Sequence, residues 1–340
     1  MTTTLAPAPL ADDRPIWDIW LSSLWLPAVL AADALGVFAA LDAEPADAAG
    51  LADRLALDGE ALVSLLALLS GLGLARVRHG RFELTAPGRL YLRRGEPLYW
   101  GEALGVMGHS PVVELLCQSL RGAAPKGHYQ AARQWGEGQA AEEAAAAVAR
   151  VMQSQSLPSA LGLAALDAFE GVKRLLDVAG GSGCFAVALA QRHPDMRCTV
   201  LELPAMGPIV AGHVAQAGLG HRVEVVEADM FADAWPGGYE AVLFSNVFHD
   251  WDARANSLLA AKAFDALVPK GRVMLHEMLL ADQRDGPLAA AAFSMMMLLA
   301  VGGRQYAARE LAAMLAEAGF GDALVRPAFG HYSLVSAARP

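Results

Sequence analysis

Five short apolar segments alternate with helical patterns in the second half of the chain, and this alternation restricts the fold more than any other feature. The segments are 173–178, 197–203, 222–228, 240–246 and 272–278. Strand-length segments that alternate with helices predict a parallel sheet with helices on both faces. Two further segments, 323–329 and 331–337, flank Gly330 and predict an appended hairpin. We therefore expect an α/β domain over 166–340, with a Rossmann-like, doubly wound sheet and a C-terminal antiparallel hairpin.

The first third of the chain predicts a different, mainly helical domain. The expected elements are helices at 15–42, 49–55 and 59–71 and a β-wing at 75–85 that turns at His79-Gly80. Helix, turn, helix and wing indicate a winged-helix domain over 1–105. A helical connector that contributes to a ligand pocket is expected over 106–165.

Winged helices often bind DNA, but the charge of this chain argues against that function. The formal net charge is −10, and the segment in the recognition position, 60–73, contains no lysine or arginine. Contacts to phosphates and base edges need such side chains. A helix that is apolar on nearly every face is buried. We expect this helix, together with the tryptophan-rich helix at 15–42, to form a dimer interface.

The chain is unusually apolar, with 55% hydrophobic residues and a mean hydropathy of +0.33. Neither candidate membrane span is convincing: 16–41 contains two aspartates and Pro27, and 288–301 is too short to cross ~30 Å of hydrocarbon. No secretory signal is visible. An odd number of cysteines without metal-ligand spacing indicates reduced thiols and a cytoplasmic location. They are Cys117, Cys184 and Cys198.

Polar residues follow the first three predicted strands. Asp177 ends the first and leads into a glycine-rich turn at 179–183, which lets a ligand approach the backbone. Glu202 ends the second, where a carboxylate accepts hydrogen bonds from both ribose hydroxyls and repels a 2′-phosphate. Asp229, followed by large apolar side chains, ends the third and suits an adenine. The carboxyl ends of parallel strands share one edge, so these groups predict an adenosine-containing ligand.

Four ordered motifs are DVAGGSG at 177–183, LELP at 201–204, EADMF at 227–231 and FHDW at 248–251. Together they resemble the S-adenosylmethionine-dependent small-molecule O-methyltransferases. The resemblance is to the dimeric kind with an N-terminal winged-helix dimerisation domain, similar to plant caffeate O-methyltransferases and bacterial antibiotic-tailoring enzymes. It covers nearly the whole chain from residue 15 onward.

The resemblance implies S-adenosylmethionine as the cofactor and a homodimer formed through the N-terminal domain. It implies His249 as the general base and Glu277 as the group that orients it. The cofactor-binding residues it implies are Asp177, Gly180, Gly181, Gly183, Glu202, Leu203, Asp229, Met230, Phe231, Ser245 and Asn246. Some relatives bind a metal beside the cofactor, but the segment 290–303 lacks the second histidine expected for it, so we predict no metal.

The expected order of the strands supports the pair of His249 and Glu277 independently of the resemblance. His249 follows the fourth strand and Glu277 ends the fifth, and in this topology the two strands are neighbours. A neutral imidazole can remove a hydroxyl proton, and a carboxylate on its other nitrogen sets the tautomer. Asp250, the next residue, is expected to bond a nearby helix terminus instead.

The expected acceptor pocket depends on adaptable and aromatic side chains, namely Met152, Trp251, Met296, Met297 and Gln305. Gln305 falls where plant relatives carry a glutamate as a second partner for the base. An amide can hydrogen-bond an imidazole but cannot offset its charge. Methyl acceptors that need no deprotonation, such as a thioether sulfur, therefore remain possible.

The sequence therefore predicts methyl transfer from S-adenosylmethionine to a small, largely apolar acceptor, at a hydroxyl. Transfer to a thioether sulfur, a nitrogen or a carbon remains an alternative. A relative that binds the cofactor without transferring methyl, such as a decarboxylase, hydroxylase or pericyclase, is a second alternative. A winged-helix regulator that senses a small ligand is the least favoured. We expect no nucleic-acid or membrane partner.

Overall fold

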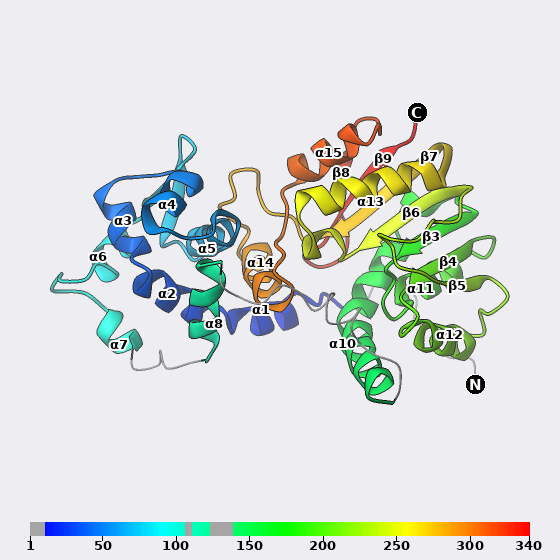
Figure 1. The fold of residues 1–340 in the computed structure, drawn as a ribbon, viewed down its shortest axis with the longest axis horizontal. Coiled ribbons are helices and arrows are strands. Elements are labelled where there is room, and N and C mark those ends of the chain that lie inside the picture. Colours follow the sequence, from blue (N-terminus) through cyan, green and yellow to red (C-terminus); the bar gives the residue numbers. More distant parts are fainter. Residues whose placement is uncertain (1–10, 106–110, 123–138) are drawn as a thin grey trace. The chain divides into compact units, whose positions relative to one another are not determined.

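The structure is a computed structural model that describes residues 11–105, 111–122 and 139–340 (Figure 1). The chain divides into two compact units that interleave in sequence. The helical unit contains 14–128 and 278–309, and the sheet unit contains 1–13, 129–277 and 310–340. The sequence instead predicts three consecutive segments, with boundaries after residues 105 and 165. Residues 1–10 of the expected first domain, and 106–110 and 123–138 of the expected connector, lie outside the described residues.

The sheet unit contains a seven-stranded sheet in the order β5-β4-β3-β6-β7-β9-β8. Neighbours from β5 to β7 are parallel, and β9 pairs antiparallel with both β7 and β8. The doubly wound sheet with a C-terminal hairpin is thus confirmed. The strands are β3 (Arg174–Val178), β4 (Arg197–Glu202), β5 (Val223–Glu227), β6 (Tyr239–Ser245), β7 (Leu267–Glu277), β8 (Leu324–Pro327) and β9 (Ser333–Ala338).

Helices cover both faces of this sheet, with α13 on one face and α10 and α11 on the other (Figure 1). A large apolar core joins α10, α11 and the central strands through residues such as Phe169, Phe185 and Leu189. Strands buried on both faces explain the continuous apolar runs of the sequence. The helices are α10 (Gln139–Ala164), η1 (Asp167–Phe169), α11 (Cys184–Arg192), α12 (Gly207–Gln216), η2 (Phe248–Asp250), α13 (Ala253–Ala266) and α15 (Ala308–Glu317).

The helical unit contains the expected helix–turn–helix and wing. The pair α4 and α5 precedes the antiparallel hairpin of β1 and β2, and Asp47 and Asp58 cap the two helices by accepting hydrogen bonds from Gly50 N and Ala61 N. The elements are α1 (Arg14–Ser22), α2 (Trp25–Ala34), α3 (Val37–Ala43), α4 (Ala48–Leu55), α5 (Gly59–Gly71), β1 (Ala75–Arg78), β2 (Arg81–Leu84), α6 (Ala86–Tyr91), α7 (Gly101–Gly105), α8 (Pro111–Leu120) and α14 (Leu288–Ala300).

The single helix expected at 15–42 is wrong, because the segment forms α1, α2 and α3. Ser22 and Ser23 donate hydrogen bonds from their hydroxyls to the carbonyls of Ile19 and Trp20, where α1 ends. Gly36, with φ +75°, then separates α2 from α3. Serine hydroxyls that bond the preceding turn and a left-handed glycine both end helices.

The apolar helix α5 is buried within its own chain. Every residue from Ala61 to Leu69 is buried, and α14 packs so closely that a Cβ on Gly71 would lie 3.0 Å from Leu288 Cα. The two helices also share a hydrogen bond of 2.8 Å between the hydroxyls of Ser64 and Ser294. Because the residues from Ala61 to Leu69 are all covered by their own chain, the expectation that this helix forms a dimer interface is wrong.

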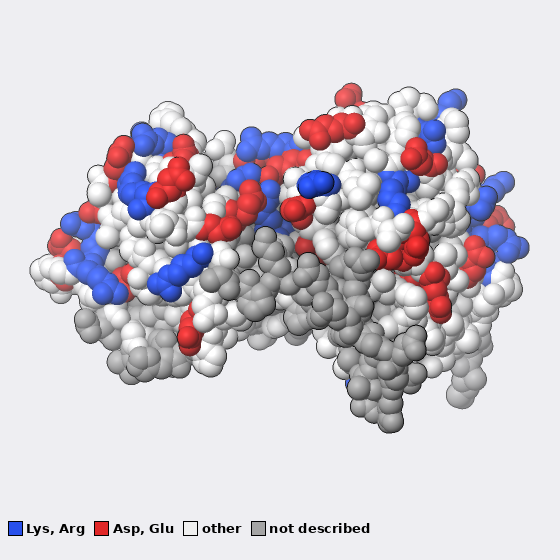
Figure 2. Space-filling view, viewed as in Figure 1, with Lys and Arg blue, Asp and Glu red and all other residues white. Residues whose placement is uncertain are grey.

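By length and composition alone, residues Arg14–Ala34 are the one helical stretch in the described ranges that could cross a membrane, and 39% of it is buried. The Arg93-Arg94 pair forms ion pairs within the helical unit, with Asp42 and Glu96 and with Asp33 respectively. On the face drawn in Figure 2, basic side chains are interspersed with acidic ones.

Candidate functional site

The glycine turn follows β3 at the carboxyl edge of the sheet. Ala179, Gly181 and Gly183 all have positive φ, at +52°, +60° and +76°. A Cβ on Gly183 would lie 2.8 Å from Val210 Cγ1, so the start of α11 has no room for a side chain there. Ala179 adopts the left-handed conformation although it carries a Cβ.

Glu202 fastens this turn to the end of β4. Its Oε1 accepts a hydrogen bond from Gly181 N at 2.9 Å, and its Oε2 accepts one from Leu203 N at 2.6 Å. Burial raises the pKa of Glu202 to about 7, against the two backbone hydrogen bonds, which lower it. The sequence predicts a ribose ligand for Glu202, and the structure adds a role in holding the turn.

Asp177 lies beneath the same turn and is almost completely buried. A Cβ on Gly180 would lie 2.8 Å from Asp177 Oδ2, so the turn rests directly on the carboxyl group. Burial, and then Glu202, raise the pKa of Asp177 to about 7, and the backbone N–H of Ala186 opposes the rise. Two adjacent buried acids suit a ligand that brings a positive charge and hydroxyl donors. S-adenosylmethionine, with its ammonium and ribose groups, fits this pair.

Asp229 builds the loop after β5. Its Oδ1 accepts hydrogen bonds from Phe231 N at 2.9 Å and Ala232 N at 3.2 Å, and its own N–H donates to Asp233 Oδ2 at 2.8 Å. Met230 is buried and Phe231 is partly exposed. The predicted adenine residues thus lie on one loop whose shape Asp229 itself determines.

Lys262, on α13, holds this loop from outside and is a residue that the sequence analysis missed. Its ammonium donates to the carbonyls of Met230 at 2.7 Å, Phe231 at 3.1 Å and Asp233 at 2.7 Å. No motif marks a lone lysine in a helix, so only the folded structure reveals it.

His249 and Glu277 meet as predicted, and β6 and β7 are neighbours. Glu277 Oε2 lies 2.7 Å from His249 Nδ1. Its Oε1 accepts hydrogen bonds from Val247 N at 3.1 Å and Phe248 N at 3.0 Å. Asn246, with φ +57°, turns the chain after β6 just before these two N–H groups.

Asp250 occupies the other side of the imidazole, with Oδ1 3.3 Å from His249 Nε2. The expectation that Asp250 bonds a helix terminus is wrong, because Asp252 caps α13 through Ala255 N at 2.8 Å. Burial alone would lower the pKa of His249. Glu277, then Asp250, and the hydrogen bond to Glu277 outweigh it and raise the pKa to about 9.

Ser245, a predicted cofactor-binding residue, contacts His276: its Oγ lies 2.9 Å from His276 Nδ1. The ring of His276 stacks on Tyr332 with centroids 4.5 Å apart. Burial lowers the pKa of His276 to about 3, so this ring stays neutral.

The predicted acceptor residues are distributed over both units. In the sheet unit, Met152 Sδ would lie 3.0 Å from a Cβ on Gly181, and Trp251 packs against Phe231 with ring centroids 4.7 Å apart. In the helical unit, Met296 and Met297 are half-buried on α14. Gln305 is fully buried, and its N–H donates to Ser294 Oγ at 3.0 Å.

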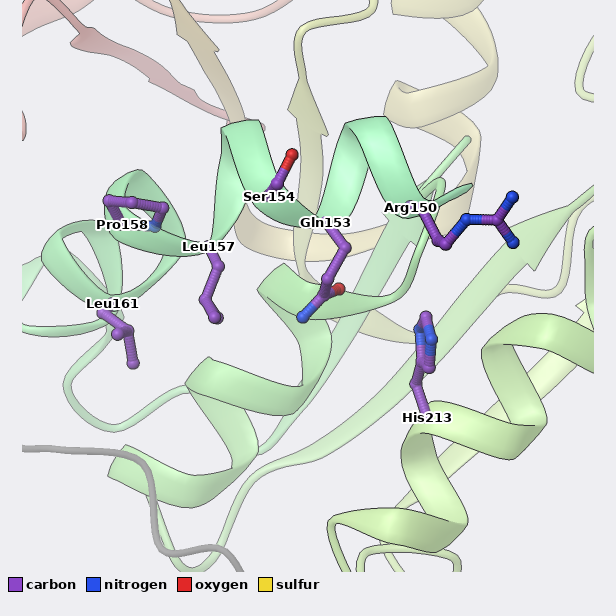
Figure 3. Close-up of a pocket in the computed structure, with 7 residues that line it drawn as sticks. All are labelled: Arg150, Gln153, Ser154, Leu157, Pro158, Leu161 and His213. Carbon is purple, nitrogen blue, oxygen red and sulfur yellow. The ribbon is translucent and has the colours of Figure 1, made fainter. Parts of the chain in front are cut away.

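A separate cavity of about 410 Å³ lies between α10 and α12 (Figure 3). It is mostly apolar, and the lining residues Arg150 and His213 lie at one end of it (Figure 3). His213 Nδ1 bonds Ser182 O at 2.9 Å, but no predicted cofactor residue lines the cavity. Among the described residues, no three His, Cys, Asp or Glu side chains cluster as metal ligands.

Comparisons with known proteins identify the family. A family model described as an O-methyltransferase domain matches residues 121–321. The 3-hydroxy-5-methyl-1-naphthoate 3-O-methyltransferase of Streptomyces sahachiroi is 34% identical over 88% of this chain and 87% of that protein. The acetylserotonin O-methyltransferase of Bos taurus is 30% identical over 91% and 92%.

Solved structures agree. An O-methyltransferase family 2 protein from Planctomyces limnophilus, in complex with apigenin, superposes with a TM-score of 0.87 at 28% identity, covering 99% of this chain and 98% of that one. Human N-acetylserotonin methyltransferase in complex with S-adenosylmethionine shares the fold, with a TM-score of 0.56 at 22% identity and 97% and 99% coverage. The chain therefore belongs to the family of S-adenosylmethionine-dependent small-molecule O-methyltransferases.

Proposed function

We propose that this enzyme methylates an aromatic hydroxyl, with His249 as the general base and Glu277 as its positioning partner. The observation that carries the proposal is that the two carboxylate oxygens of Glu277 bind different partners. One is held by two backbone N–H groups, and the other is therefore aimed at His249 Nδ1. A carboxylate on Nδ1 leaves Nε2 to take a proton.

The residues of the turn and the adjacent strand ends would hold the cofactor. Glu202 would accept hydrogen bonds from the ribose hydroxyls, and the carboxylate of Asp177 would balance the positive charge of the cofactor's ammonium group. The loop at 229–233 would bind the adenine. Bound S-adenosylmethionine would supply an electrophilic methyl group. The chain's own contribution to catalysis is to position the hydroxyl, exclude water and remove the proton.

His249 performs the proton transfer in this scheme. Its neutral form donates from Nδ1 to Glu277 and presents an acceptor lone pair on Nε2. When Nε2 takes the hydroxyl proton, the imidazolium is stabilised by the buried carboxylate 2.7 Å away. Glu277 keeps its own position throughout, because the backbone of Val247 and Phe248 holds its other oxygen.

Two relatives support an aromatic acceptor. The Streptomyces sahachiroi enzyme is named for a hydroxynaphthoate, and the Planctomyces limnophilus structure contains apigenin. Both molecules carry hydroxyls on aromatic rings, whose oxyanions form more readily than aliphatic ones. Met152, Trp251, Met296, Met297 and Gln305 remain our proposed acceptor residues.

Carbon methylation is the second candidate. The L-tyrosine C(3)-methyltransferase of Streptomyces lavendulae is 36% identical over 44% of this chain. Ring carbons beside a phenolate are nucleophilic, so the same base serves both reactions.

We also propose a cytoplasmic homodimer that associates through the helical unit, with no nucleic-acid or membrane partner. Helix α1 supports this, because Ile16 and Ile19 are each 70% exposed and Trp20 is 42% exposed. Large apolar side chains grouped on one helix are typical of protein interfaces.

The test is a product screen. The purified enzyme is incubated with S-adenosylmethionine and a set of hydroxylated naphthoates and flavones, apigenin included, together with thioether and amine compounds. We expect mass spectrometry to find methyl ethers of aromatic hydroxyls. Methylation confined to sulfur or nitrogen, or turnover without any methylated product, would contradict the proposal.

A further inference from the structure

His249 lies between two carboxylates that differ in accessibility. Glu277 Oε2 lies 2.7 Å from Nδ1, and Asp250 Oδ1 lies 3.3 Å from Nε2. The Glu277 side chain is 3% exposed, whereas that of Asp250 is 33% exposed. Of the two acids, the one beside Nε2 is thus the one that solvent and ligands can reach.

This arrangement conflicts with the needs of a general base. A base must direct a free lone pair at the hydroxyl it deprotonates. Ionised carboxylates only accept hydrogen bonds, so Nε2 is attracted to Asp250 when it carries a proton. With Nδ1 also donating to Glu277, this geometry favours a proton on each ring nitrogen, which makes the ring an imidazolium.

The charges around the ring agree with that state. Two carboxylates act on His249: that of Glu277, at the end of β7, and that of Asp250, on η2 itself. His276, also on β7, stays neutral because burial lowers its pKa to about 3. The two acids overcome the effect of burial and raise the pKa of His249 to about 9.

We propose that Asp250 is a positioning residue that blocks the base in the ligand-free enzyme, so that an acceptor hydroxyl must displace its carboxylate before Nε2 can take a proton. The inference rests on the proposed role of His249. When the carboxylate is displaced, the Nε2 proton leaves to solvent, and the neutral ring then takes the hydroxyl proton. One proton is released on binding and one is taken up during reaction, so turnover regenerates the imidazolium beside Asp250.

This device has a functional consequence. An imidazolium cannot activate water, so His249 becomes a base only when a hydroxyl has replaced the Asp250 carboxylate. Protection of a reactive methyl donor from hydrolysis is a recognised benefit of excluding water from an active site.

The test needs no methyl acceptor, so its result can be interpreted even if the proposed function is wrong. The full-length protein is labelled with ¹³C,¹⁵N-histidine, and the His249 ring signal is assigned by its loss in His249→Gln. We expect a midpoint near pH 9 in the wild type and a midpoint at least about one pH unit lower in Asp250→Asn, the usual effect of removing one close opposite charge. An unchanged midpoint in a folded Asp250→Asn protein would overturn the proposal, and Asp250→Ser serves if the first variant does not fold.

Asp252→Asn is the matched control. It removes the same charge two residues away, and asparagine caps helices as well as aspartate does, so the His249 midpoint should not move. With an acceptor in hand, the rising limb of kcat/KM against pH should shift down in Asp250→Asn by the same amount as the midpoint. Lower activity at every pH without such a shift would contradict the proposal.

Discussion

At the scale of single residues, the tautomer of His249 depends on how Glu277 uses its two oxygens. The buried backbone N–H groups of Val247 and Phe248 need an acceptor, so the Glu277 oxygen that faces them is held by these two hydrogen bonds. The remaining oxygen then determines which ring nitrogen carries the proton. This makes the side chain sensitive to a change that preserves its shape.

Glu277→Gln is therefore expected to invert the tautomer while preserving the fold. The amide oxygen continues to accept from the two backbone N–H groups, and the NH₂ group donates to Nδ1, which forces the proton onto Nε2. We expect kcat to fall by roughly 10²- to 10⁴-fold, the range for loss of a base-orienting carboxylate.

Steady-state kinetics measures the loss, and ¹⁵N NMR of the labelled ring reports the tautomer. As a control, thermal unfolding and the Kd for S-adenosylhomocysteine should stay close to wild type. A variant with near-normal kcat would show that Glu277 does not set the tautomer.

The two buried acids under the glycine turn predict a pH dependence of cofactor binding. Burial raises the pKa of Glu202 to about 7, so it is protonated below that pH in the free enzyme and ionised above it. Ribose hydroxyls bind the ionised form, so affinity rises with pH through 7 and falls below it. We expect the Kd for S-adenosylhomocysteine to be about tenfold weaker near pH 6 than near pH 7.5.

Calorimetry at several pH values measures this, with Glu202→Gln as the comparison. The variant should bind more weakly at pH 7.5 and show a flatter dependence. An equally steep dependence in Glu202→Gln would exclude Glu202 as its source.

At the scale of elements, α13 stabilises the adenine loop through one side chain. The ammonium of Lys262 donates to three carbonyls of a loop that Asp229, Asp233 and the indole N–H of Trp235 also hold. Lys262→Met leaves those carbonyls without this partner and should weaken S-adenosylhomocysteine binding by about tenfold, which corresponds to the lower end of the ~1.5–3 kcal/mol for hydrogen bonds to a charged group.

Binding calorimetry checks this prediction, with Lys173→Met as the control because that side chain is exposed. We expect kcat at saturating cofactor to change little, since Lys262 holds the adenine loop whereas Glu277 positions the base. Unchanged cofactor affinity in Lys262→Met would refute the role.

The elements also show what sequence reasoning can and cannot reach. The parallel strands were predictable because strands buried on both faces are short, continuous apolar runs. The His249–Glu277 pair was predicted from the resemblance to the family, and the expected order of the strands supported it. The contact of Asp250 with Nε2 did not, because it depends on the tight turn of η2, which brings consecutive side chains together without any periodic signal.

Long-range packing was equally hidden. The segment at 59–71 has the apolar character of a buried helix, but nothing in it indicates that its cover, α14, lies more than two hundred residues away in the chain. The expectation that this helix lies in a dimer interface failed for this reason. Likewise, the break between α1 and α2 depends on serine hydroxyls that compete for helix carbonyls, an effect that composition does not reveal.

At the scale of the whole molecule, the exposed residues of α1 become the predicted dimer contact. Ile16→Asp with Ile19→Asp places two charges on side chains that are each 70% exposed, so the monomer fold should tolerate them. We expect wild type to elute as a dimer in size-exclusion chromatography with light scattering and the double variant as a monomer.

Leu324→Asp is the control, because Leu324 is 68% exposed but lies on β8 in the sheet unit. It should leave the dimer intact. A monomeric wild type, or a double variant that stays dimeric, would contradict an interface at α1.

The central claim is that His249 removes the acceptor proton in an enzyme whose cofactor site is built separately by the strand ends. The most direct measurement compares His249→Ala with wild type for both methyl transfer and S-adenosylhomocysteine binding. We expect kcat to fall by about 10²-fold or more, as for loss of a general base, while the Kd changes by less than about twofold. Near-normal turnover in His249→Ala with an aromatic hydroxyl acceptor would contradict the account.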